Sequence, residues 1–146
     1  MKLLVIGIIV AVVAAVVAIA VVPRGAAPIA APSGTAQTAE FSERYQPYSE
    51  QALAEAGPDD TVVLFFSAAW CATCKVLRDD IAANQENIPD DVRILLVDFD
   101  DSTALKQQYE VVAQHTLVQA DRSGEGIARW NSSRSLDELL ATIVAV

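Results

Sequence analysis

The sequence predicts an α/β fold in which a four-stranded mixed sheet has helices on both sides. Two apolar runs, residues 62–66 and 94–97, have the composition of buried parallel strands and are separated by a helical segment. A hairpin pattern then joins residues 116–120 to residues 127–130, and an amphipathic helix follows. Parallel strands need a crossover helix and a hairpin adds antiparallel strands, so the order helix, β-α-β, α, β-β-α gives a mixed sheet.

A membrane-spanning helix is predicted ahead of this domain. Residues 3–22 carry no charged or hydrogen-bonding side chain, and a helix of that length is about 30 Å long, the thickness of a bilayer's hydrocarbon core. A signal peptide has an apolar run of only about 7–15 residues, so residues 1–22 are expected to be an uncleaved signal anchor, with cleavage near residues 26–31 as the alternative. Residues 23–39 are rich in Ala, Pro and Gly and predict a flexible linker to a domain over residues 40–146.

The elements of the domain begin and end at recognisable residues. Residues 41–56 have apolar side chains at helical spacing from Tyr45 onward and predict a helix that ends at Gly57. The helix between the two apolar strands is expected to continue to about Glu86. A later short helix is expected to begin at Ser102, which has a good capping side chain.

The final helix has the clearest pattern. Ser135 and Glu138 have the spacing of a capping box, and Leu136, Leu139 and Ile143 lie on one helical face.

The predicted domain is strongly acidic. It holds all 19 Asp and Glu residues but only eight of the ten Lys and Arg residues, a formal charge of −11. This charge argues against nucleic acid and anionic lipid as ligands of the domain.

The two cysteines of the chain, Cys71 and Cys74, are spaced C-x-x-C where an apolar strand gives way to a helix. Cysteines on a first helical turn close a disulfide with little backbone movement, and the free N–H groups there favour the thiolate of the leading cysteine. A closed four-ligand zinc site is not expected, because there is no second C-x-x-C pair and only one histidine, His115. Thiol–disulfide exchange is therefore predicted, with Cys71 as the attacking thiolate and Cys74 as the resolving thiol; an inert buried pair is the alternative.

Three stretches carry a family resemblance: VVLFFSAAWCATCK at residues 62–75, Val-Asp-Phe-Asp at residues 97–100, and Thr-Leu-Val at residues 116–118 before a Gly-containing hairpin. With them, residues 40–146 resemble the thioredoxin superfamily. The apolar span makes the chain most similar to the tethered, TlpA-like thiol–disulfide proteins of bacterial envelopes. The resemblance implies a thioredoxin-like fold and an oxidoreductase that exchanges its disulfide with protein thiols through a mixed disulfide. It further implies an upstream redox partner in the membrane and no cofactor.

The chain departs from the family pattern at two positions. Thioredoxins carry a buried Asp six residues before the first cysteine and a cis-proline before the Thr of the third strand; this chain has Phe65 and His115 there, the latter ahead of Thr116. A cis bond before a residue other than proline costs about 2.5–4 kcal/mol, so the Gln114–His115 peptide is expected to be trans.

If the loop still runs past the cysteines, His115 lies close to two sulfurs. It would then stabilise a thiolate, shuttle a proton or complete a three-ligand metal site, and a merely packed imidazole is the alternative. One hypothesis is that His115 lowers the pKa of Cys71.

The neighbours of the cysteines have lesser expected roles. Trp70 is expected to shield the disulfide and to offer a docking surface, with plain packing as the alternative. Ala72 and Thr73 lie between the cysteines, where the resemblance implies that they tune the reduction potential. Lys75 either adds positive charge beside Cys74 or is an ordinary exposed helix residue.

Two other functions remain open. Cys71, Cys74 and His115 together suit Cu(I), which would make the chain a copper-binding protein of the same fold. A redox-sensing or scaffold domain would have a reversible disulfide with negligible turnover.

The cellular location is inferred from the chemistry. Lys2 and Arg24 flank the apolar span almost symmetrically, so the positive-inside rule gives no clear orientation. A tethered dithiol usually works on the oxidising side of a membrane. The chain is therefore expected to be a single-pass cell-membrane protein with its domain outside the cytoplasm.

Overall fold

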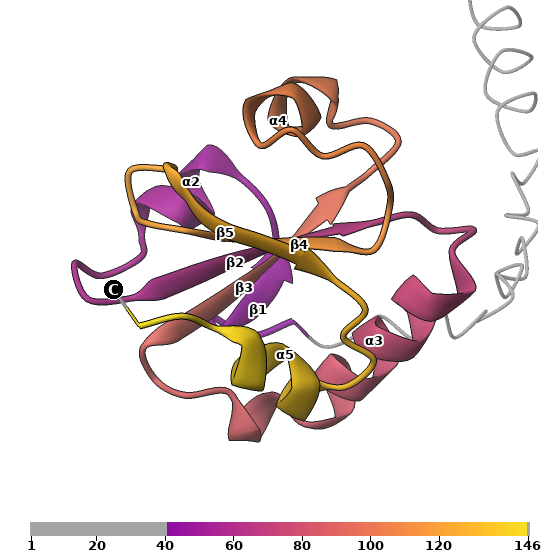
Figure 1. Ribbon diagram of the computed structural model, residues 1–146. Coiled ribbons are helices and arrows are strands. Elements are labelled where there is room, and N and C mark those ends of the chain that lie inside the picture. The colour runs from indigo at the N-terminus through magenta and orange to yellow at the C-terminus, as the bar shows by residue number, and fades with distance from the viewer. Residues whose placement is uncertain (1–40, 146) are drawn as a thin grey trace, which may run out of the picture. The chain divides into compact units, whose positions relative to one another are not determined.

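A five-stranded sheet forms the centre of the structure, a computed structural model that describes residues 41–145 (Figure 1). The strand order is β1-β3-β2-β4-β5. The three strands β1, β3 and β2 run parallel, β4 runs antiparallel to β2, and β5 runs antiparallel to β4. The strands are β1 (Tyr45–Pro47), β2 (Thr61–Ser67), β3 (Val92–Asp98), β4 (Thr116–Ala120) and β5 (Gly126–Asn131).

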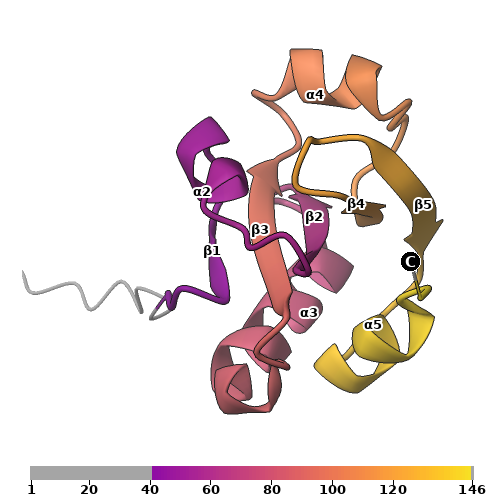
Figure 2. The same ribbon diagram turned by 90° about the vertical axis from the view of Figure 1, so that its left-hand side faces the viewer.

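Helices cover both faces of this sheet. The helices are α2 (Glu50–Ala54), α3 (Ala72–Ala83), the 3-10 turn η1 (Gln85–Asn87), α4 (Thr103–Gln108) and α5 (Leu136–Thr142). Figure 2 shows α3 and α5 on one side of the sheet and α4 on the other. The buried residues agree: one apolar cluster contains Leu77 of α3 and Leu139 of α5, and the other contains Ala52 of α2 with Leu105 of α4 packed against it.

Strand β2 contributes side chains to both of these clusters. Val63 and Phe65 belong to the cluster under α3 and α5, whereas Val62, Leu64 and Phe66 belong to the cluster on the opposite face. All five are fully buried. The prediction of a central strand covered on both faces is confirmed, because successive side chains of a strand point to opposite sides.

The prediction of four strands is wrong, and the missing strand is β1. Tyr45 pairs with Ile94 of β3 inside the range predicted to be helical, and helix α2 begins only at Glu50. The spacing of Tyr45 and Ala52 does not mark one helical face, since they lie in different clusters on opposite sides of the sheet. Ser49 then starts α2 by accepting the Ala52 N–H at 3.0 Å.

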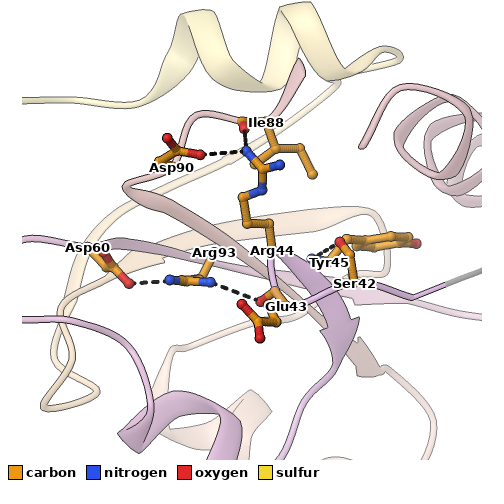
Figure 3. Close-up of polar contacts among 8 residues, drawn as sticks. All are labelled: Ser42, Glu43, Arg44, Tyr45, Asp60, Ile88, Asp90 and Arg93. Carbon is orange, nitrogen blue, oxygen red and sulfur yellow. Dashed lines mark hydrogen bonds and ion pairs between the residues drawn. The ribbon is translucent and has the colours of Figure 1, made fainter. Parts of the chain in front are cut away.

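Side chains of two arginines fasten the β1 edge to the rest of the sheet (Figure 3). Arg44 donates to the carbonyl of Ile88. Arg93 on β3 donates to Asp60 at 2.8 Å and to the carbonyl of Glu43 at 3.3 Å. The hydrogen bond from Arg93 holds the pKa of Asp60 below its usual value. Side-chain contacts thus hold the segment before β1, in addition to the short run of backbone hydrogen bonds between β1 and β3.

The remaining element boundaries differ from prediction mainly at helix ends. Helix α3 ends at Ala83, and η1 occupies the last turn of the predicted helix. Ser102 precedes α4 as predicted but makes no side-chain capping bond. At α5, Ser135 accepts the Glu138 N–H at 3.2 Å, while the Glu138 carboxylate accepts the N–H of Arg134 and so completes only half of a capping box. The hairpin of β4 and β5 is confirmed.

Within residues 41–145, every helix falls short of the length and apolar character that crossing a membrane requires. The predicted anchor, residues 1–22, and linker, residues 23–39, lie outside the described residues.

Candidate active site

Cys71 and Cys74 form a disulfide at the junction of β2 and α3, with their Cα atoms 5.2 Å apart. Cys71 is the N-cap residue of α3, and its Sγ accepts the Cys74 N–H at 3.1 Å. The same sulfur lies 3.3 Å from the Thr73 hydroxyl. Two donors therefore already point at the sulfur that carries the negative charge when Cys71 is a thiolate.

The two cysteines differ in accessibility. Cys71 is 5% exposed and Cys74 is completely buried. Of the two sulfurs, the one that an external disulfide can approach is therefore that of Cys71.

An arginine holds the turn that presents Cys71. Arg78, on the second turn of α3, donates to the Ser67 hydroxyl and to the Ala68 carbonyl at 3.2 Å. The Ala68 carbonyl also accepts the Cys71 N–H at 3.2 Å. The side chain of Arg78 therefore ties α3 to the end of β2 and to the turn that leads into Cys71. Sequence reasoning did not single out Arg78, because only the fold places it over that turn.

His115 lies beside the disulfide, immediately before β4. No cis peptide bond occurs in residues 41–145, so the expectation of a trans bond before His115 is confirmed. The backbone instead turns through a positive φ of 61° at His115, and its N–H binds the Phe66 carbonyl at 2.8 Å. One ring nitrogen of His115 and the sulfurs of Cys71 and Cys74 all lie within 4.8 Å of one another.

The hydrogen bonds of the ring define its protonation pattern. The Nε2 atom lies 2.8 Å from the carbonyl oxygen of Ser133. A carbonyl can only accept, so Nε2 carries the hydrogen and Nδ1 of a neutral ring has a free lone pair. Nδ1 is buried and has no hydrogen-bond partner. The site thus holds a base that is shielded from water and close to two sulfurs.

Phe65 replaces the family's acidic residue and is fully buried in the same cluster as both cysteines. Its ring contacts the imidazole of His115 edge-on, with centroids 5.6 Å apart. No Asp or Glu is buried anywhere in residues 41–145. Within this part of the chain, His115 is therefore the buried side chain with a free lone pair that can accept a proton from a thiol.

Trp70 immediately precedes Cys71 and has 64% of its surface exposed, so packing in the core is not its role. Its indole N–H donates to the Asp100 carboxylate at 3.0 Å. Asp98 shapes the loop that carries Asp100, because its side chain accepts the N–H groups of Asp100 and Asp101 at 2.8 and 3.0 Å. An exposed aromatic side chain is thereby held in one orientation, as a contact surface requires.

The other expected neighbours are also near the disulfide in the fold. Ala72 and Thr73 are exposed on the first turn of α3. Lys75 is exposed and forms an ion pair with Asp79 one turn later. Thr116 is buried, and its hydroxyl donates to the Ala113 carbonyl at 2.7 Å, which closes the turn around His115.

A mixed sheet with a C-x-x-C disulfide at the start of the helix that follows its central strand defines the thioredoxin-fold thiol–disulfide proteins. The chain belongs to the thioredoxin family, since the family model described as Thioredoxin matches residues 42–145. It is similar to the thioredoxin of Chlamydia trachomatis serovar D, with 31% identity over 98 residues that make up 67% of this chain and 94% of the relative.

Solved structures give the same result. Trxlp from Edwardsiella tarda EIB202 shares 30% identity with a TM-score of 0.53, over 64% of this chain and 92% of that chain. Fasciola hepatica thioredoxin shares 27% identity with a TM-score of 0.53, over 64% of this chain and 86% of that chain. With its C-x-x-C disulfide, the chain is a thiol–disulfide oxidoreductase.

Proposed function

We propose that the chain is a membrane-anchored oxidoreductase that exchanges the Cys71–Cys74 disulfide with protein thiols outside the cytoplasm. The observation that carries the mechanism is the contrast between the two sulfurs. Cys71 Sγ caps α3 and receives the Cys74 N–H at 3.1 Å, whereas Cys74 is fully buried behind it.

In the reducing direction, the Cys71 thiolate attacks one sulfur of a substrate disulfide. The substrate's S–S bond breaks, a Cys71 mixed disulfide forms, and the departing substrate thiolate takes up a proton. Cys74 then attacks Cys71 Sγ, which forms the Cys71–Cys74 disulfide and releases the second substrate thiolate. Two electrons pass from the dithiol to the substrate, and the oxidising direction reverses the same steps.

His115 has the position to make the second step fast. Cys74 is buried among apolar side chains, an environment that raises the pKa of a thiol and so disfavours the thiolate that must attack. The unpartnered Nδ1 of His115 can accept the Cys74 proton and return it to the leaving substrate thiolate. His115 would thus do the work of the carboxylate that other thioredoxins carry at the position of Phe65.

The proposed location rests on the sequence. The uncharged run of residues 3–22 is long enough to span a bilayer, and residues 23–39 give a tether of Ala, Pro and Gly. A disulfide exchanger on such a tether suits an oxidising compartment. The upstream partner would be a membrane protein that resets the Cys71–Cys74 pair.

Trapping the mixed disulfide tests the proposed order of attack. The full-length chain, purified in a mild detergent, is incubated with a disulfide-bonded protein substrate. Cys74→Ser is expected to accumulate a covalent complex that thiols reverse, and Cys71→Ser is expected to form none. Equal trapping by both variants, or trapping by Cys71→Ser alone, would contradict the assigned roles.

The proposed role of His115 is tested on the resolving step itself. Asn tolerates positive φ better than most residues, so His115→Asn removes the imidazole with little backbone strain. Decay of the preformed mixed disulfide is expected to slow by about 10²-fold near neutral pH, the lower end of the usual effect of a general base. The deficit is expected to shrink as alkaline pH ionises Cys74 without help. Gln114→Ala is the matched control, and a deficit that stays constant with pH would contradict the role.

Topology is tested in cells that express the full-length chain. Protease added to spheroplasts is expected to digest the domain while cytoplasmic markers survive. If the domain is digested only after detergent dissolves the membrane, the domain lies in the cytoplasm and the proposed topology is wrong.

A further inference from the structure

We infer that the reduced site is also a Cu(I)-binding site made by Cys71, Cys74 and His115, and that formation of the disulfide abolishes the binding. The three candidate ligand atoms lie within 4.8 Å of one another, and all three residues are buried. The inference goes beyond thiol–disulfide exchange, because it assigns a metal-bound state to the dithiol.

The spacing of the ligand atoms suits one metal ion. Metal–sulfur bonds of about 2.3 Å and metal–nitrogen bonds of about 2.0 Å place ligand atoms about 3.5–4.0 Å apart at tetrahedral or trigonal angles. In the oxidised site, the sulfurs are bonded to each other and the nitrogen lies within 4.8 Å of both. Reduction breaks the S–S bond, and the separating sulfurs then frame a position that a metal can fill next to the ring.

The orientation of His115 is that of a metal ligand. Ligating histidines nearly always donate their second ring N–H to a carbonyl or carboxylate, which fixes the tautomer and aims the other nitrogen at the metal. Here Nε2 donates to the Ser133 carbonyl at 2.8 Å, and Ser133 is itself buried. Nδ1 is left buried without a hydrogen-bond partner, although leaving a buried polar atom unsatisfied normally destabilises a fold. A bound metal would satisfy this atom.

The donor set selects the metal. Two thiolates and an imidazole are soft to intermediate ligands, which suit Cu(I) and Zn²⁺. Structural Zn²⁺ takes four ligands, and within residues 41–145 no fourth His, Cys, Asp or Glu joins this cluster. Cu(I) accepts lower coordination numbers, so three buried ligands favour Cu(I).

Binding and disulfide exchange exclude each other at this site. Reduction of the Cys71–Cys74 disulfide by a dithiol reductant supplies two electrons and two protons and yields the two thiols. Cu(I) then displaces both thiol protons and binds the thiolates without a change in its oxidation state. When an external disulfide reoxidises the pair, two electrons leave the thiolates, the S–S bond forms again, and Cu(I) loses two of its three ligands.

The test is an anaerobic titration of the full-length chain in detergent, in competition with a chromogenic Cu(I) chelator. The dithiol form is expected to take one Cu(I) per chain and the disulfide form none. His115→Asn is expected to weaken binding at least about tenfold, since even residues behind the ligands affect affinity by 10–100-fold. The matched control Gln114→Ala is expected to bind like the parent chain. A small-molecule disulfide is expected to release the bound Cu(I) in step with re-formation of the Cys71–Cys74 bond.

Three outcomes would overturn the inference. Equal affinity of the parent chain and His115→Asn would remove the imidazole from the site. One Cu(I) per two chains would show a site made between molecules. Displacement of Cu(I) by an equal concentration of Zn²⁺ would overturn the choice of metal. This experiment measures metal affinity, so a failure of the Cu(I) inference can be told apart from a failure of the proposed disulfide exchange, which the substrate-trapping experiment tests.

Discussion

The Thr73 hydroxyl is expected to stabilise the Cys71 thiolate, and Thr73→Val is the change that tests this. Its Oγ1 atom lies 3.3 Å from Cys71 Sγ, next to the Cys74 N–H at 3.1 Å. Toward a thiolate, the hydroxyl can act only as a donor. Valine keeps the branched shape of threonine and removes that donor.

The expected magnitude follows from the strength of one hydrogen bond. A net contribution of about 0.5–1.5 kcal/mol is usual, and Thr73 is exposed, so the lower half of that range applies. One pKa unit corresponds to 1.36 kcal/mol, so about 0.5–1 kcal/mol raises the pKa of Cys71 by roughly 0.4–0.7.

The assay is the rate of alkylation of the reduced full-length chain against pH, because only the thiolate reacts. Thr73→Ser retains the hydroxyl and is expected to leave the profile close to that of the parent chain. If Thr73→Val does not move the midpoint, or if Thr73→Ser moves it equally, the hydroxyl does not stabilise the thiolate.

Three further predictions concern the imidazole, an ion pair and the core. His115→Asn is expected to raise the alkylation midpoint of Cys71, because an imidazole that has accepted a proton at Nδ1 places a positive charge beside the sulfurs. An unchanged profile would disprove the hypothesis that the imidazole lowers the pKa of Cys71. Asp60→Asn is expected to lower the free energy of unfolding at pH 7 by about 1–2 kcal/mol, because it removes the charged partner of Arg93. The pKa of Asp60 is lower in the folded chain than in the unfolded chain, so this stabilisation is present above the unfolded pKa near 3.8 and is lost as the pH falls through the folded value. Urea titrations in which Asp60→Asn is destabilised as much at acid pH as at pH 7 would contradict this. Leu77→Ala, at a fully buried position of α3, is expected to cost about 2–5 kcal/mol in the same measurement, and a loss below about 1 kcal/mol would mean that the site repacks.

The sequence predicted the centre of the fold better than its edge. Strands β2 and β3 are apolar over most of their length because they are covered on both faces, and such runs are visible without any partner. Strand β1 has only three residues and its pairing is entirely with a strand about fifty positions later. No local pattern encodes that contact, and the apolar residues from Tyr45 onward happen to have the spacing of a helical face, which led to the wrong prediction.

The same division applies to the site. The C-x-x-C pair and its position at a helix start are local features, so the sequence located them. The contacts that give the site its chemistry join distant segments: His115 to Ser133, Trp70 to Asp100 and Arg78 to Ala68. The resemblance aligned His115 with the cysteines, but the free lone pair of Nδ1 follows from the Ser133 carbonyl, which only the folded chain brings to the ring.

The place of β2 in the middle of the sheet has a consequence for how the molecule opens. Its backbone is hydrogen-bonded to β3 on one side and to β4 on the other, so each of its amide hydrogens exchanges with solvent only when the neighbour that accepts it separates. The outer strands β1 and β5 have one partner each and can fray while the centre stays closed. Cys71 lies shortly after the end of this doubly paired strand, so fraying of β1 or β5 leaves in place the junction of β2 and α3 that presents the two sulfurs.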